Sequence, residues 1–114
     1  MAMGAPHGFE RSVSRGIVSA LERYFDFAPY NLWIQTDAAI NFGNSGGALV
    51  DATGRLVGLN SAIAGRQAGI EGIGFAIPVD LVRGVVDAII RDGRVVRGWI
   101  GVVPSNISSE AIQQ

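Results

Sequence analysis

The sequence predicts a small, mainly β domain, a barrel or sandwich, with one helix near its C-terminal end. Two observations carry this prediction. Sixteen glycines are spread through 114 residues and separate short runs of β-branched residues, a pattern typical of short strands joined by tight turns. A single apolar stripe with helical spacing follows Pro78, so one helix is expected after most of the strands.

Runs of β-branched and aromatic residues predict six strands. The first strand contains a bend at Gly16, and the hairpin in the middle of the chain is the clearest pair because Gly54 lies in its turn. Polar or aromatic loops are expected over residues 24–31 and 65–72. The predicted strands cover residues 12–21, 32–36, 48–51, 56–63, 73–77 and 95–103.

The predicted helix spans about residues 79–92. Pro78 suits a helix start because it lacks an N–H group, and Asp80 complements the positive end of the helix dipole. Gly93 suits the left-handed residue that ends a helix. Ile89 and Ile90 are expected to cover the end of the barrel. The apolar stripe to which they belong consists of Leu81, Val82, Val85, Val86, Ala88, Ile89 and Ile90.

The composition suits one globular domain, with 48% hydrophobic and 17% charged residues. A net charge of −1 argues against nucleic acid and against an anionic membrane as partners. Cysteine is absent and no ligand cluster with metal-site spacing occurs, so we expect neither a metal nor another cofactor. We expect no membrane insertion, and residues 1–8 lack the basic region and apolar core of a signal peptide.

The segment from Phe42 to Gly47, Phe-Gly-Asn-Ser-Gly-Gly, is the strongest indication of function. Flanking glycines let a loop expose the Ser45 hydroxyl while backbone N–H groups converge on one point, the geometry of an acyl-transfer nucleophile and its oxyanion hole. The segment matches the Gly-x-Ser-x-Gly elbow of α/β-hydrolases, but that elbow requires a helix directly after the serine. A hairpin follows here instead. Serine between glycines is also common in turns without chemistry, so the motif alone leaves a structural role open.

Five segments in a fixed order make the interpretation specific: residues 16–20, 34–41, 43–49, 72–78 and 97–101. Together they closely resemble the C-terminal barrel of the HtrA (Deg) family of trypsin-like serine proteases. The resemblance covers nearly all of residues 3–103. It implies a six-stranded trypsin-like half-barrel with one C-terminal α-helix over residues 1–103. Residues 104–114 are then a tail, or the lead-in to a PDZ domain outside this sequence.

The resemblance also implies roles for individual residues. Ser45 matches the nucleophile, and the backbone N–H groups of Gly43 and Ser45 match the oxyanion hole. The segment 60–63 matches the strand that pairs with the substrate backbone, and further positions match the walls of a pocket for small or medium apolar side chains. The implied substrate-binding residues are Ala39, Asn60, Ser61, Ala62, Ile63 and Gly74.

Two features depart from the family pattern. Phe42 stands where the family usually has proline. More importantly, the catalytic histidine and aspartate of the family belong to a preceding barrel, so we expect this chain to lack both. His7 is the only histidine, and it matches a structural turn, so we expect it to face solvent rather than act as the base. Activity of the chain alone is therefore expected to be very low.

Three classes of function remain open at this point. The chain is the nucleophile-bearing part of an HtrA-like endopeptidase, a non-catalytic peptide-binding or self-associating module, or a structural half-barrel without activity. The expected partners are a polypeptide substrate or peptide and, through an exposed apolar cleft face, either a second copy in a homodimer or the missing N-terminal barrel. Members of the family are usually periplasmic or otherwise extracytoplasmic.

Overall fold

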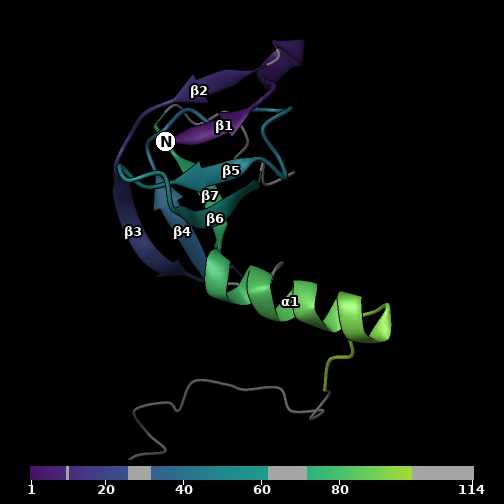
Figure 1. Ribbon diagram of the computed structural model, residues 1–114. Helices are drawn as coiled ribbons and strands as arrows, with labels where there is room; N and C mark the ends of the chain where they lie inside the picture. Colours follow the sequence, from purple (N-terminus) through teal and green to yellow (C-terminus); the bar gives the residue numbers. More distant parts are fainter. Residues whose placement is uncertain (10, 26–31, 62–71, 99–114) are drawn as a thin grey trace, which may run out of the picture.

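A computed structural model describes residues 1–9, 11–25, 32–61 and 72–98. Seven strands form one antiparallel sheet in the order β2-β1-β5-β6-β7-β4-β3, and helix α1 follows β7 (Figure 1). The elements are β1 Ala2–Gly4, β2 Ser12–Ser14, β3 Val18–Arg23, β4 Trp33–Thr36, β5 Ala48–Val50, β6 Leu56–Ser61, β7 Gly74–Pro78 and α1 Val79–Asp92, with a 3-10 turn at Pro6–Gly8.

The sheet is strongly curled. Its two edge strands, β2 and β3, stand at opposite ends of the strand order but are joined only by Arg15, Gly16 and Ile17. The Cα atoms of Ser14 and Val18 can therefore lie roughly 14 Å apart at most, so these ends of the two edge strands have to approach each other. This curvature produces the barrel-like shape seen in Figure 1 and confirms the mainly β fold expected of a trypsin-like half-barrel.

The number of strands differs from the six expected. The predicted first strand is two strands, because Gly16 lies in the connection between β2 and β3, where a Cβ would meet Asp37 and the Ala38 backbone. Strand β1 was not predicted, since Ala2–Gly4 contains no β-branched or aromatic residue. Residues 95–98 form no strand, and the rest of the predicted strand 95–103 lies outside the described residues.

A small apolar core lies between the curled strands. Its buried members are Ala2, Ile34, Ala38, Leu49 and Ala76, and two partly buried residues, Ile40 and Val57, pack against them. Side chains also pack outside this core. Trp33 is buried, and the ring of Phe25, just after β3, meets that of Phe75 edge-on at a centroid distance of 5.0 Å. Strands β4 and β5, which contribute Ile34 and Leu49 to this core, also border the loop described below.

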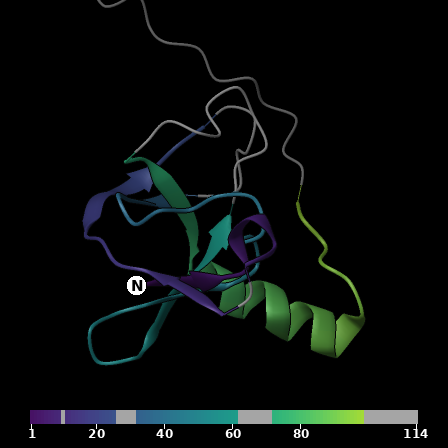
Figure 2. The same ribbon diagram turned by 90° about the horizontal axis from the view of Figure 1, so that it is seen from above.

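Helix α1 begins and ends where the sequence predicted. Gly93 adopts the left-handed conformation with φ of 70° and its N–H donates to the Ile89 carbonyl. The stripe covers the sheet only in part, because Ile89 and Ile90 are 49% and 79% exposed as the helix runs beyond the sheet (Figure 2). Within the described ranges, no helix has both the length and the apolar character needed to cross a membrane.

The β5–β6 turn gives a prediction for pH dependence. The Thr53 hydroxyl, followed by the Arg55 backbone N–H, holds the pKa of the Asp51 carboxyl well below its usual range. A lowered folded-state pKa contributes stability that is present above the unfolded-state value of 3.8 and is lost as pH falls toward the folded value. We therefore expect the Asp51→Asn variant to melt below the parent at neutral pH and the gap to narrow in thermal melts below about pH 4. A gap that is constant down to strongly acidic pH would contradict this assignment.

Candidate active site

The serine loop, residues 37–47, connects β4 to β5 and has no regular structure of its own. Ser45 lies in a turn and is exposed, whereas its neighbour Asn44 is 4% exposed. The N–H of Asn44 donates to the Asn41 carbonyl at 3.0 Å, and the N–H of Gly47 donates to the Asn44 carbonyl at 2.9 Å. The loop therefore turns sharply on both sides of the serine, with the serine on the outside.

The N-terminal segment holds the loop just before the serine. The N–H of Ala5 donates to the Gly43 carbonyl at 3.1 Å, and the N–H of His7 donates to the Phe42 carbonyl at 2.9 Å. Gly43 has φ of +99°, and a Cβ at this position would collide with the Ala5 carbonyl oxygen. Glycine is thus required both for the backbone conformation and for the close approach. Among the described residues, no hydrogen bond uses the Gly43 N–H.

Strand β6 holds the loop just after the serine. The N–H of Gly46 donates to the Asn60 carbonyl at 2.9 Å, and the N–H of Asn60 donates to the Gly47 carbonyl at 2.8 Å. The Asn60 side chain is 2% exposed and its Nδ2 donates to the carbonyls of Met3 and Ala48 at 3.0 and 3.2 Å. Asn60 therefore fastens the loop to β1 and β5 at the same time.

The start of the loop is fastened to the β2–β3 connection. The N–H of Ile17 donates to Asp37 Oδ1 at 2.7 Å, and the hydroxyl of buried Thr36 donates to the Ile17 carbonyl at 2.7 Å. The Ser14 hydroxyl donates to the Ala39 carbonyl at 2.8 Å, and Asn44 Nδ2 donates to the same carbonyl at 3.3 Å. Asp37 thus satisfies a backbone donor and carries no pairing with a histidine.

The predicted substrate-binding residues differ in where the structure places them. Ala39 is exposed and Ser61 is half-buried, while Ala62 and Ile63 lie outside the described residues. Both backbone groups of Asn60 already bind the serine loop, so the expectation that Asn60 pairs with a substrate does not fit this geometry. Gly74 is buried, and a Cβ there would lie 3.0 Å from the Ile40 side chain. Sequence reasoning missed Ile40 because an isoleucine in a loop carries no signal of its own.

His7 is exposed, and no hydrogen bond of its ring occurs within the described part of the chain. It meets the loop through its backbone, not through its imidazole. Within the same ranges, no group of three histidine, aspartate or glutamate side chains comes together to hold a metal ion. The loop places an exposed serine two positions after the Gly43 N–H, which has no partner among the described residues, and a hydroxyl with a backbone donor are the types of group that attack on a carbonyl group uses.

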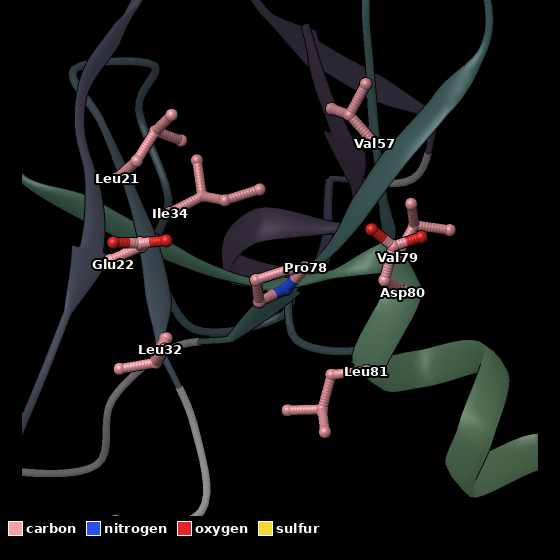
Figure 3. Close-up of a pocket in the computed structure, with 9 residues that line it drawn as sticks. All are labelled: Leu21, Glu22, Leu32, Ile34, Val57, Pro78, Val79, Asp80 and Leu81. Atoms are coloured by element: carbon pink, nitrogen blue, oxygen red, sulfur yellow. The ribbon is translucent and has the colours of Figure 1, made fainter.

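Away from the serine loop, two adjoining cavities of about 510 and 630 Å³ form a concave surface, here called the apolar trough. They share Leu21, Ile34 and Val57, from strands β3, β4 and β6. Figure 3 shows the first cavity, bordered on one side by Pro78 to Leu81 where β7 passes into α1. Ser45 lines neither cavity, so the trough is separate from the serine loop.

The known proteins that this chain resembles are all described as peptidases. Residues 1–59 match the family described as the trypsin-like peptidase domain. A curated relative from Pseudomonas putida, described as a probable periplasmic serine endoprotease DegP-like, is 46% identical over 110 residues. One from Halomonas elongata with the same description is 46% identical over 109 residues. Each alignment covers 96% of this chain but 23% of the relative, so the chain spans about a quarter of their length.

Solved structures agree with these matches. The HtrA-type protease AlgW with tripeptide is 49% identical with a TM-score of 0.89, over 98% of this chain and 38% of that chain. The serine endoprotease from Yersinia pestis is 45% identical with a TM-score of 0.72, over 90% of this chain and 34% of that one. The sequence identities and the TM-scores together show that this chain is similar to these serine proteases in both sequence and fold.

Glycines on either side of Ser45 give a matched test of the loop. A Cβ at Gly46 has open space but a φ of +81°, whereas a Cβ at Gly43 has both an unfavourable φ and a collision with Ala5. We expect Gly46→Ala to lower the free energy of unfolding by about 1–2 kcal/mol through backbone strain alone. Gly43→Ala should cost about 1–3 kcal/mol more, because the Ala5 segment has to move. Urea unfolding measures both, and equal losses would contradict the close packing of Ala5 on Gly43.

Proposed function

Because the chain belongs to the trypsin-like peptidase family and to its HtrA group, we propose that it supplies the nucleophile and the oxyanion hole of a serine endopeptidase. Ser45 is the proposed nucleophile, and the N–H groups of Gly43 and Ser45 are the proposed oxyanion donors. The histidine and aspartate of the triad are proposed to lie in the part of the relatives' length that this chain does not span. In keeping with the relatives' description, the proposed compartment is the periplasm.

One observation carries this proposal. The Gly43 N–H stands two positions before an exposed serine in a loop held on both sides, and no described group accepts a hydrogen bond from it. A fixed donor without a protein partner is suited to an oxygen that becomes negative during a reaction, because it needs no reorganisation when the charge develops. Such preorganised donors typically contribute about 10²–10³-fold to turnover.

The proposed chemistry is acyl transfer. The Ser45 Oγ attacks the carbonyl carbon of a peptide bond and gives its proton to the histidine on the other part of the protease. The carbonyl oxygen becomes the oxyanion and accepts from the Gly43 N–H. The histidine then protonates the leaving amine, and water releases the acyl group in the second half of the reaction.

Substrate binding is proposed for the end of β6 and the residues beyond it. Both backbone groups of Asn60 are occupied and Ser61 is paired with Phe75 of β7, so pairing with the substrate backbone is assigned to the residues that follow, Ala62 and Ile63. Ala39 and Gly74 are proposed pocket walls, and Ile40 fills the space beside Gly74. Because two of the similar AlgW structures are described with a tripeptide and with a decapeptide, an extended peptide is the proposed ligand.

Labelling by a fluorophosphonate tests the nucleophile directly. We expect slow labelling of the chain alone, because a serine without its general base keeps only the part of catalysis that comes from the oxyanion hole and binding. Labelling should disappear in Ser45→Ala and persist in Ser19→Ala, a matched change at another exposed serine. The label is read by mass spectrometry.

Two outcomes would overturn the proposal. Labelling that survives Ser45→Ala would remove Ser45 as the nucleophile. Brisk casein hydrolysis by the chain alone that is lost in Ser45→Ala would place a working base within these residues. Peptide binding by a folded chain that never labels at Ser45 would favour the alternative, a non-catalytic peptide-binding module.

The apolar trough favours a second proposal, association with another polypeptide. Ile17, Val18 and Leu21 are 68%, 52% and 66% exposed along it, although exposed apolar residues normally occur singly. In the complete protease, the part that carries histidine and aspartate is the proposed cover. In the isolated chain, the proposed cover is a second copy in a two-fold dimer.

Sedimentation equilibrium tests the dimer. We expect the chain to be dimeric at high micromolar concentration and Leu21→Lys to shift it to monomer, since Leu21 lines both cavities. Burial of one leucine is worth about 1.5–3 kcal/mol, enough to change the dissociation constant by more than tenfold. The control is Val13→Lys, which alters another exposed apolar residue, 58% exposed against 66% for Leu21, outside the trough. A monomer at every concentration, or equal effects of both changes, would contradict the trough as the interface.

A further inference from the structure

Strand β3 is interrupted where it borders the apolar trough. Its pairing with β4 shifts register between Ala20 and Arg23, so Leu21 and Glu22 together stand opposite one residue, Ile34. Glu22 has a φ of 56°, in the left-handed region that favours glycine. Successive side chains of a regular strand point to opposite faces, but Leu21 and Glu22 both line the first cavity. The bulge therefore turns a carboxylate toward an apolar surface, and backbone strain of this kind is typical of functional positions.

A second carboxylate borders the same cavity. Asp80, in the first turn of α1, lines it together with Glu22, and Figure 3 shows the two carboxylates on different sides of the cavity. Both residues are exposed, and neither takes part in an ion pair within the described ranges. This end of the trough, here called the acidic end, thus combines an apolar floor with two carboxylates that no described basic residue pairs with.

The other end of the trough, here called the basic end, carries Arg15. This residue lines the second cavity but not the first, is exposed, and makes no ion pair in the described part of the chain. Asp51 lines the second cavity as well, but its carboxylate lies 2.9 Å from Arg55 Nε. Asp51 is therefore already paired, and the trough has unpaired charges of opposite sign at its two ends.

Two copies can lie trough on trough about a two-fold axis in two ways. With the axis along the trough, each end meets the same end of the other copy, so carboxylates face carboxylates and Arg15 faces Arg15. With the axis across the trough, at the residues that both cavities share, the basic end of each copy meets the acidic end of the other. Opposed like charges cost free energy and complementary charges attract, so the charges of this chain favour the second arrangement.

We propose that the apolar trough binds a second copy of this chain with the two-fold axis across it, so that Arg15 of each copy lies against Glu22 and Asp80 of the other. The idea rests on the proposed dimer and adds which ends of the two troughs meet. The guanidinium group of arginine carries five N–H donors in a fixed fork, which suits it to two carboxylates at once. The apolar surfaces, with Leu21 beside the axis, provide the affinity, and the charged ends set the orientation.

Exchange of the charges tests the orientation. Arg15→Glu opposes like charges at both symmetric contacts and should raise the dissociation constant about tenfold or more. Glu22→Arg should also weaken the dimer, but less, because Asp80 still attracts Arg15. In an equimolar mixture of the two variants, both contacts again hold an opposite pair, so the dissociation constant should fall about fivefold or more below that of either variant alone. Sedimentation equilibrium measures these constants, native mass spectrometry identifies the heterodimer, and thermal melts show that each variant is folded.

Two further variants control the result. Arg94→Glu makes the same change of net charge at an exposed arginine outside the trough, so it should leave the dimer unchanged and should not associate preferentially with Glu22→Arg. Glu22→Gln keeps the size of the side chain and removes one charge from each contact. It should weaken the dimer about threefold, which keeps the orientation testable even if Glu22→Arg does not fold.

The remaining outcomes separate this orientation from the dimer itself. If Leu21→Lys breaks the dimer while Arg15→Glu and Glu22→Gln leave it intact, the trough stays the interface and the proposed orientation is wrong. Assemblies larger than a dimer in the mixture would show head-to-tail contacts and would overturn the two-fold axis. A parent chain that is monomeric at every concentration would overturn both the dimer and its orientation. Labelling of Ser45 does not depend on any of these results.

Discussion

Backbone hydrogen bonds from distant parts of the chain hold the irregular serine loop in place. The serine loop receives donors from Ala5 and His7 on one side and exchanges two bonds with Asn60 on the other. None of these partners is near Ser45 in the sequence. The loop therefore has its shape only when β1, β5 and β6 are assembled next to one another, so the candidate site is a property of the folded sheet.

Asn60 and Asn44 show what this arrangement costs. Both side chains are buried and direct their amide nitrogens at main-chain carbonyls, while their Oδ1 atoms have no partner in the described residues. A buried acceptor without a donor typically costs about 1–3 kcal/mol. Apolar side chains of similar size would avoid that cost but would remove the amide donors to the carbonyls of Met3 and Ala48, whereas the Ala39 carbonyl would keep the Ser14 hydroxyl. The two amide side chains thus lower the stability of the fold but hold the loop in one defined position.

Sequence patterns predicted the features that side chains determine. Pro78, Asp80 and Gly93 located the helix, Gly54 located the hairpin turn, and glycines around Ser45 located the loop. Backbone pairings were not predictable, because any residue except proline supplies the same N–H and carbonyl. Strand β1, the anchoring role of Asn60 and the bond from His7 are all of this kind. The prediction that Ile89 and Ile90 cover the end of the barrel was wrong for a different reason. Periodicity shows which face of a helix is apolar, but it does not show how far the sheet extends beneath the helix.

The hydrogen bonds that hold the serine loop also affect how the parts of the proposed protease depend on one another. The hydrogen bonds described at Phe42, Gly43 and Gly46 join residues of this chain, so they support the shape of the loop around the proposed oxyanion donor from within it. A general base acts by position as well as by pKa, and its effect is realised only if the oxyanion is stabilised in the same step. In the proposed protease, one part of the protein would orient the oxyanion donor and another part would supply the general base. The two requirements of catalysis would then be met by different parts. Assembly of the parts would then complete the catalytic group without rebuilding the loop that holds Ser45.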